Sequence, residues 1–169
     1  MPVQRLNHAV LYVRDVERSV AFYSDVLGFR VVMGFPGAAF LQAEGSSNDH
    51  DLGLFQVGAE AGDTQAGRTT VGLYHLAWEV DTLDELERIQ QRLVAAGALA
   101  GASDHATTKA LYAKDPDGLE FEVSWLLPAD LITEDVLARK ASIDRLDLAK
   151  EKARYGGGTR GGVGVSVPA

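Results

Sequence analysis

Residues Leu111–Val123, with the sequence LYAKDPDGLEFEV, decide the fold of this chain because they hold a tight turn between two apolar strands. Pro116 fixes φ at the second turn position, Asp115 can bond its own downstream backbone, and Gly118 tolerates a left-handed conformation. The pattern predicts one strand before the turn and a second strand over residues 119–125.

Glu122 is the first candidate metal ligand. Side chains alternate along strands, so the hairpin points Tyr112 and Glu122 into the space that it borders. Glu122 stands between Phe121 and Val123, and a carboxylate on an apolar strand is costly to bury unless it meets a cation. A lone strand glutamate more often faces solvent. Glu120 on the same strand face is the main rival for the role, and the spacing from Gly118 favours Glu122.

A β-α-β-β-β order occurs twice along the chain, at an offset of about 67 residues. Each copy begins with an apolar strand, continues with a helical stripe that ends at a glycine, Gly28 or Gly97, and ends with further strands. His8 and His75 then lie on equivalent first strands. The strands are predicted at about residues 6–13, 29–33, 38–43, 51–57, 73–80, 109–114 and 119–125, and the helical stripes at residues 16–27 and 86–94, capped by Asp15 and Asp81.

These patterns predict an α+β fold of two modules. Each module has one helix on one face of a mixed sheet, and the other faces of the two sheets form a cleft around a metal site. The predicted two-module domain covers residues 1–127, with module one at about 5–57, a linker at 58–70 and module two at about 71–127. A helical extension is predicted at 128–155, mainly one helix over 133–154. A flexible Gly-rich tail is predicted at 156–169.

The composition bounds the class of protein. The 169 residues carry a formal net charge of -8, which argues against nucleic acid and anionic membranes as partners. No cysteine is present, so any metal must be bound by histidine, carboxylate or water. No apolar run approaches a membrane span and the first residues lack an apolar signal region, so we expect a soluble, cytoplasmic protein. We also expect a homodimer or higher homo-oligomer. The apolar stripe of the C-terminal helix must pack on its own domain or on a partner, and the sequence gives no basis for choosing between them.

The four histidines are His8, His50, His75 and His105. A single strand histidine is more often a hydrogen-bonded structural residue than a ligand, but His8 and His75 lie on first strands and Glu122 lies on a last strand. Two histidines and one carboxylate around a cleft match the arrangement that holds Fe(II) and leaves positions open for substrate and dioxygen. Mn(II), Ni(II) and Zn(II) accept similar ligands, so the residues leave the metal open.

The chain resembles the vicinal oxygen chelate superfamily, which includes glyoxalase I, extradiol catechol dioxygenases, fosfomycin- and bleomycin-resistance proteins and methylmalonyl-CoA epimerase. The matching motifs cover residues 5–126: HAVLYVRD from His8, FY at 22–23 with LGF at 27–29, HLAWEV from His75, and DPDG at 115–118 followed by Glu122. The resemblance implies that His8, His75 and Glu122 take the family's metal-ligand positions.

Within the superfamily, the extradiol dioxygenases are the most similar. Glyoxalase-like members usually add a fourth ligand, often Glu, from the last strand of module one. Here that strand carries Leu52, Leu54 and Gln56, and no Glu lies between Glu44 and Glu60. Three protein ligands leave more coordination positions for a catecholate and O2.

Three non-ligand positions also resemble the extradiol enzymes. His50 matches the family's acid–base histidine, and His105 with Tyr112 matches the segment that contacts substrate, so one implied site accounts for all four histidines. The chain departs from the family where Ala106 follows His105 in place of a common Gly. It also has a single pair of modules, as the smaller extradiol enzymes do.

The resemblance implies extradiol ring cleavage of a small aromatic diol by O2 at Fe(II). The ion lowers the pKa of catechol hydroxyls, and His50 would move a proton, since an unperturbed imidazole titrates at about 6.5. Tyr112 and His105 would hydrogen-bond the substrate oxygen. The alternatives are a metal-dependent isomerase or lyase of the glyoxalase or epimerase type, a metal-free resistance protein that binds a small molecule, and purely structural histidines with Glu122 paired to an Arg.

Overall fold

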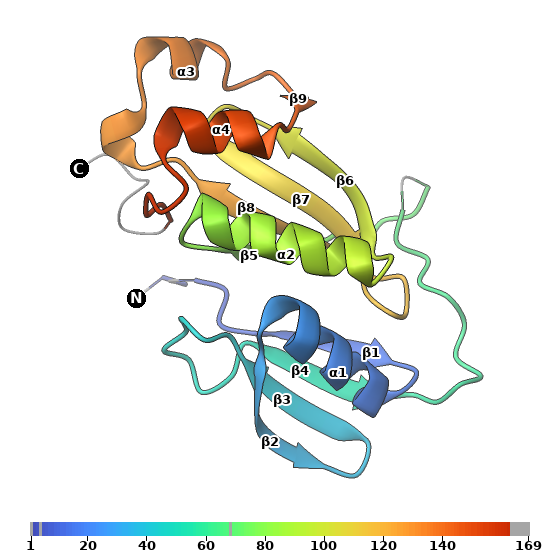
Figure 1. Cartoon of the computed structure of the whole chain (residues 1–169). Coiled ribbons are helices and arrows are strands. Elements are labelled where there is room, and N and C mark those ends of the chain that lie inside the picture. Colours follow the sequence, from blue (N-terminus) through green and yellow to red (C-terminus); the bar gives the residue numbers. More distant parts are fainter. Residues whose placement is uncertain (1, 4, 68, 163–169) are drawn as a thin grey trace. The chain divides into compact units, whose positions relative to one another are not determined.

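The computed structural model describes residues 2–3, 5–67 and 69–162. The chain groups into two compact units, and Figure 1 shows the elements of each. The first unit comprises the residues up to Gln65 together with Asp115–Gly118, and the second comprises Ala66–Lys114 and the residues from Leu119 onward. Within the described ranges, no helix combines the length and apolar character that a membrane span requires.

The first unit is one α-helix on a four-stranded sheet. Its elements are β1 (Ala9–Val13), α1 (Val16–Leu27), β2 (Arg30–Phe35), β3 (Ala38–Gln42) and β4 (Leu52–Gln56). The strand order is β1-β4-β3-β2, in which β1 and β4 are parallel and the other neighbours antiparallel. Helix α1 packs on β2, β3 and β4, and Tyr23, Leu41 and Leu54 are buried in this core.

The local signals that predicted α1 are confirmed. The side chain of Asp15 accepts a hydrogen bond from the N–H of Arg18 at 3.0 Å, which is an N-cap. Gly28 ends the helix with a φ of 78°. On the buried face, the hydroxyl of Tyr23 donates to Asp115 at 3.1 Å. Burial, followed by the charge of Asp115, raises the pKa of Tyr23 well above its ordinary value.

The second unit repeats this order and extends it. Its elements are β5 (Leu76–Glu79), α2 (Leu83–Ala95), β6 (Leu99–Asp104), β7 (Thr108–Lys114) and β8 (Glu120–Leu126), then a 3-10 turn (Ala129–Leu131), α3 (Glu134–Ala138), β9 (Asp144–Arg145) and α4 (Leu148–Tyr155). The strand order is β5-β8-β7-β6-β9, in which β5 and β8 are parallel and the rest antiparallel. The predicted α+β fold, with the β-α-β-β-β order in both halves, is confirmed.

The predicted turn between β7 and β8 is also confirmed. Gly118 has a φ of 84°, and its N–H donates to the carbonyl of Asp115 at 3.0 Å. The side chain of Asp115 accepts from the N–H of Asp117 at 2.9 Å. The resulting register sets Tyr112 directly opposite Glu122.

Two local predictions were wrong, and one strand had no predicted range. The repeat requires a strand between α2 and β7, but the residue pattern does not mark β6, because its sequence LAGASD lacks the β-branched and aromatic residues that favour strands; β6 nevertheless pairs with β7. Helix α2 begins after Thr82, whose hydroxyl accepts from the N–H of Glu85 at 3.2 Å, and not after Asp81. The helix expected over residues 133–154 is divided into α3 and α4 by β9, which pairs with the edge of β6.

Residues 156–162, expected to be flexible, pack against the second unit instead. The carbonyl of Gly157 accepts from the N–H of Asp84 at 3.0 Å, at the start of α2. The carbonyl of Thr159 accepts from the indole N–H of Trp125 at 3.2 Å. A Cβ on Gly161 would overlap the backbone of β8, so glycine is needed here because it lets the two backbones pack closely. The rest of the expected tail, residues 163–169, lies outside the described residues.

Candidate active site

His75 and Glu122 are neighbours in the second unit. His75 directly precedes β5, and the parallel pairing of β5 with β8 sets Ala77 beside Glu122. Nε2 of His75 is 3.4 Å from Oε2 of Glu122, and the two side chains are 25% and 15% exposed. Nδ1 of His75 is buried and has no hydrogen-bond partner among the described residues.

This pair suits a divalent cation. Nitrogen and carboxylate ligands lie about 2.0–2.2 Å from an ion such as Zn(II), so two adjacent ligand atoms on one ion are about 3.0–3.5 Å apart. The 3.4 Å spacing of His75 and Glu122 falls in that range. Over the described ranges, no three His, Cys, Asp or Glu side chains are close enough together to hold a metal ion. The pair therefore offers two ligands, and a full site needs at least one more.

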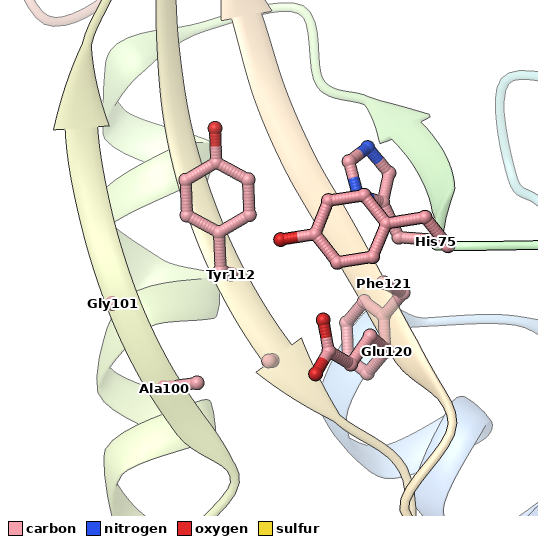
Figure 2. Close-up of a pocket in the computed structure, with 8 residues that line it drawn as sticks. His75, Ala100, Gly101, Tyr112, Glu120 and Phe121 are labelled. Carbon is pink, nitrogen blue, oxygen red and sulfur yellow. The ribbon is translucent and has the colours of Figure 1, made fainter. Parts of the chain in front are cut away.

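Glu120, the rival carboxylate, has a different environment. Its carboxylate is 3.5 Å from Nζ of Lys114, and its side chain is 40% exposed. With His75 and Tyr112 it lines a cavity of about 190 Å³, which Figure 2 shows. The contact with His75 favours Glu122 as the ligand and leaves Glu120 as part of the cavity wall. The other lining residues are Tyr74, Ala100, Gly101, Ala113 and Phe121.

An imidazole, a phenol and a hydroxyl meet on β6 and β7. Nε2 of His105 is 3.0 Å from the hydroxyl of Tyr112 and 2.8 Å from that of Ser103. The Ser103 hydroxyl lies 3.3 Å from the Tyr112 oxygen, to which it donates. The rings of Tyr112 and His75 have centroids 6.1 Å apart. This group can therefore exchange protons next to the candidate ligand.

In the first unit, His8 and His50 lie side by side. His8 directly precedes β1, and the two imidazole centroids are 4.5 Å apart. The ring of His50 packs edge-on against Phe40 at 5.1 Å, and its Nδ1 is 3.2 Å from the carboxylate of Asp49. A hydrogen bond from the backbone N–H of His50 lowers the pKa of Asp49 below its ordinary value. The carboxylate therefore stays charged beside the imidazole.

The six predicted site residues thus occur as two local groups. The first unit brings together His8 and His50, and the second brings together His75, Glu122, His105 and Tyr112. Their roles stay predictions. The motifs assigned no role to Ser103, because its contact with His105 depends on β6, for which the residue pattern gives no range.

Two β-α-β-β-β units, each with a histidine directly before its first strand, define a class of paired-module α+β proteins. Residues 5–123 match the Glyoxalase/Bleomycin resistance protein/Dioxygenase superfamily. The chain belongs to this superfamily, and the resemblance seen in its motifs is confirmed.

The relatives include dioxygenases, lyases and a metallothiol transferase. Catechol-2,3-dioxygenase of Bacillus subtilis is 35% identical over 118 residues, which are 70% of this chain and 40% of that protein. Lactoylglutathione lyase of Neisseria meningitidis serogroup A is 30% identical over 122 residues, 70% of this chain and 88% of that protein. A manganese-dependent 2,3-dihydroxybiphenyl 1,2-dioxygenase of Geobacillus genomosp. 3 is 26% identical over 125 residues, 72% of this chain and 36% of that protein. The chain therefore spans less than half the length of these dioxygenases.

A solved structure shows the same fold. The glyoxylase/bleomycin resistance protein/dioxygenase domain from Frankia sp. EAN1pec has a TM-score of 0.59 and 23% identity, over 73% of this chain and 92% of that domain. At this identity the likeness establishes the fold alone.

Proposed function

We propose that the chain is an extradiol-type ring-cleaving dioxygenase that acts on a small aromatic diol with O2. In this proposal His8, His75 and Glu122 hold the metal ion. Fe(II) is the first choice, and Mn(II), Ni(II) and Zn(II) are the alternatives. The 35% identity to a catechol-2,3-dioxygenase supports the reaction class, and a manganese-dependent relative keeps Mn(II) as the main alternative.

The observation that carries this proposal is the register of the two parallel strand pairs. The pairing of β5 with β8 sets Glu122 beside the residue two positions after His75. The pairing of β1 with β4 sets Gly53 beside the residue two positions after His8. Module one therefore has no side chain at the position that corresponds to Glu122. A metal with three protein ligands keeps more positions open for a diol and dioxygen than one with four.

The proposed roles follow from the local geometry. A bound divalent ion supplies positive charge that lowers the pKa of the diol hydroxyls. His50, whose Nδ1 faces Asp49 at 3.2 Å, would accept a proton from a hydroxyl at its Nε2 and return it later. His105 and Tyr112, which are 3.0 Å apart, would donate hydrogen bonds to a substrate oxygen and stabilise negative charge there.

The test is oxygen uptake by anaerobically purified, Fe(II)-loaded protein given a panel of catechols. We expect uptake with a yellow ring-fission product. Loss of a residue that only orients a metal ligand typically lowers metal affinity by about 10–100-fold, and Glu122→Gln should lower Fe(II) affinity by more than this. Glu120→Gln is the control, because it makes the same change two residues away on the same strand face, and it should keep iron. If Glu120→Gln loses iron and Glu122→Gln keeps it, then Glu120 and not Glu122 is the carboxylate ligand.

A metal-dependent lyase is the second candidate, because the chain matches 88% of the lactoylglutathione lyase and only 40% of the catechol-2,3-dioxygenase. It predicts metal binding without oxygen uptake, and turnover of lactoylglutathione under nitrogen. Protein that retains no metal at all would exclude both enzymes and leave a metal-free protein that binds a small molecule.

A further inference from the structure

The turn between β6 and β7 carries His105 and has an unusual backbone. Ala106 has a φ of 63° and, in the ranges that the structure describes, it is the one non-glycine residue with a positive φ. A Cβ makes this left-handed conformation costly, so surrounding contacts must hold it. Two backbone bonds shape the turn: the N–H of His105 donates to the carbonyl of Thr108 at 2.9 Å, and the N–H of Thr107 donates to the carbonyl of His105 at 2.8 Å.

A buried ion pair holds the backbone N–H and carbonyl of Ala106. The N–H donates to Oδ1 of Asp104 at 2.7 Å, and the carbonyl accepts from Nζ of Lys109 at 3.1 Å. Nζ of Lys109 is 2.5 Å from the same Oδ1. Charge-assisted hydrogen bonds therefore clamp the left-handed residue from both sides.

The C-terminal segment completes this cluster. Oε2 of Glu151, on α4, is 2.9 Å from Nζ of Lys109. This contact is an ion pair, whereas the hydrogen bonds of the ammonium group go to Asp104 and to the carbonyl of Ala106. The side chains of Asp104, Lys109 and Glu151 are 7%, 1% and 4% exposed, so water cannot replace a lost partner. The cluster has two carboxylates and one ammonium group, and Arg139, 3.5 Å from Asp104, adds a second positive charge beside it.

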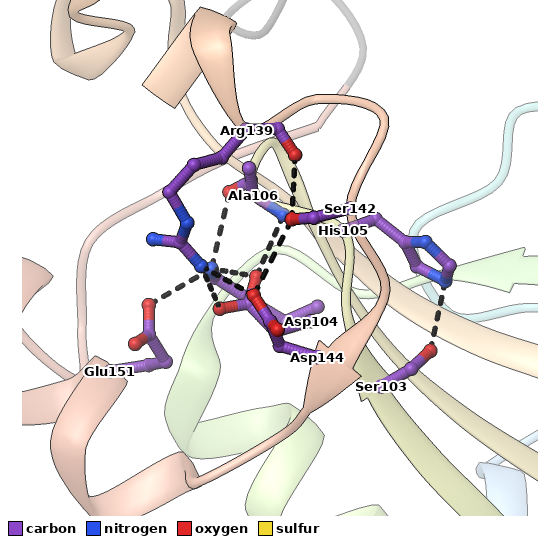
Figure 3. Close-up of polar contacts among 9 residues, drawn as sticks. Ser103, Asp104, His105, Ala106, Arg139, Ser142, Asp144 and Glu151 are labelled. Carbon is purple, nitrogen blue, oxygen red and sulfur yellow. Dashed lines mark hydrogen bonds and ion pairs between the residues drawn. The ribbon is translucent and has the colours of Figure 1, made fainter. Parts of the chain in front are cut away.

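The cluster and the candidate site lie on opposite sides of the same turn. Side chains alternate along β6, so Ser103 and Asp104 point to opposite faces. Figure 3 shows Asp104 and Glu151 on one side, and His105 bonded to Ser103 on the other. A change in the backbone conformation of the turn would move the His105 ring away from the Tyr112 hydroxyl.

We propose that Asp104, Lys109 and Glu151 are positioning residues that hold the left-handed turn at Ala106 and thereby keep Nε2 of His105 against Tyr112. The catalytic value of this position rests on the proposed dioxygenase function, whereas the position itself does not. The C-terminal segment, which lies beyond the residues that match the superfamily, therefore contributes to the candidate site through Glu151.

The test uses Glu151→Gln and Ala106→Gly, singly and together, in the full chain. Long-range 1H–15N spectra of the imidazole rings report the tautomer and hydrogen bonding of His105 without substrate. Glu151→Gln should shift the His105 signals. Ala106→Gly should return them to the wild-type position in the double variant, because glycine adopts a positive φ without the clamp. In the oxygen-uptake assay, kcat/KM should fall about tenfold in Glu151→Gln and recover in the double variant.

Glu87→Gln is the control, because Glu87 on α2 binds Lys152 of the same helix α4 at 2.5 Å. It weakens the docking of α4 without touching the turn, and the His105 signals should not move. Unchanged His105 signals in Glu151→Gln, or signals that glycine at position 106 does not restore, would overturn the proposal. If Glu151→Gln does not fold, Glu151→Asp replaces it, with the same expectation at smaller amplitude. Spectra that respond as expected, without oxygen uptake on any catechol, would reject the dioxygenase and leave the positioning role standing.

Discussion

At the residue scale, the carboxylate of Asp104 shows how the buried cluster stabilises a charge. Burial by itself raises the pKa of this carboxyl. The hydrogen bond and charge of Lys109, the N–H of Ala106 and the charge of Arg139 outweigh burial, so the pKa of Asp104 lies below its ordinary value. An aspartate in the unfolded chain titrates near 3.9. Asp104 therefore contributes stability that is fully present above about pH 4 and is lost as the pH falls through its folded pKa.

Asp104→Asn should make the protein less stable at neutral pH and less sensitive to acid. Breaking a buried ion pair costs about 3–5 kcal/mol in the free energy of unfolding. Because the variant has no carboxylate to protonate at this position, its unfolding free energy should also fall less steeply below about pH 4. Urea unfolding at pH 7 and at several acidic pH values measures both effects. Asp144→Asn is the control. Asp144 also binds Arg139, but its side chain is 55% exposed, so this variant should keep the wild-type acid dependence. An identical acid dependence in both variants would contradict the prediction.

Some site residues could be predicted from local spacing, and others could not. The distance from Gly118 favoured Glu122 over Glu120, and the structure sets Glu122, not Glu120, beside His75 at 3.4 Å. The contact of Ser103 with His105 could not be predicted, because it depends on a strand that the residue pattern does not reveal. The sequence therefore pointed to Glu122, which belongs to a recognisable motif, and did not point to Ser103, which reaches His105 only through the pairing of β6 with β7.

At the element scale, the elements defined by local sequence were predicted, and those that depend on tertiary pairing were not. Helix α1 was predicted because its stripe and its caps at Asp15 and Gly28 lie within one stretch of chain. Strand β6 forms from small residues because it pairs on both sides, with β7 and with β9. The charged stretch after Thr133 does not continue as one helix, because Arg139 binds Asp144 at 3.0 Å and β9 joins the sheet.

Gly161→Ala should destabilise the second unit, because a Cβ at this position would overlap the carbonyl oxygen of Leu126 and lie 2.8 Å from Nε1 of Trp125. Overpacking of this kind costs about 1–3 kcal/mol, which corresponds to a fall in Tm of roughly 2–12 °C for a chain of this size. Differential scanning calorimetry measures it. Gly158→Ala is the control, because nothing lies within 4 Å of its Cβ position, and it should change stability by less than about 0.5 kcal/mol. Equal shifts in the two variants would mean that residues 156–162 do not pack as described.

At the scale of the whole molecule, the internal repeat made the two units predictable, because one periodicity occurs twice. The C-terminal segment has no counterpart in the repeat, so nothing in the pattern showed where it packs. The structure buries Val136, Leu146 and Leu148 of this segment within the second unit, while Ile143 is 74% exposed. The apolar stripe is thus largely covered by its own unit, and the homo-oligomer expected from it stays a prediction.

The C-terminal segment is an integral part of the second unit, so a chain that ends after Leu127 should be much less stable than the full chain. Truncation removes Glu151 and leaves Lys109, whose side chain is 1% exposed, with Asp104 as its one remaining acidic partner in the cluster. It also removes the carbonyl that accepts from the indole of Trp125. The loss of the Lys109–Glu151 ion pair and of this packing should lower the free energy of unfolding by at least about 3–5 kcal/mol, measured by urea unfolding followed by circular dichroism.

Lys109→Met separates the contribution of charge from the lost apolar packing. In the full chain it removes the ammonium group that binds both Asp104 and Glu151 and leaves Arg139, at 3.5 Å from Asp104, as the remaining cation, so it should destabilise the protein by about 3–5 kcal/mol. In the truncated chain it removes a cation that has lost a carboxylate partner and become open to solvent competition, so it should cost far less or stabilise the chain. The same substitution should therefore differ strongly between the two backgrounds. An equal cost in both would mean that Lys109 does not depend on α4, and the segment would then be an appendage to a unit that is complete without it.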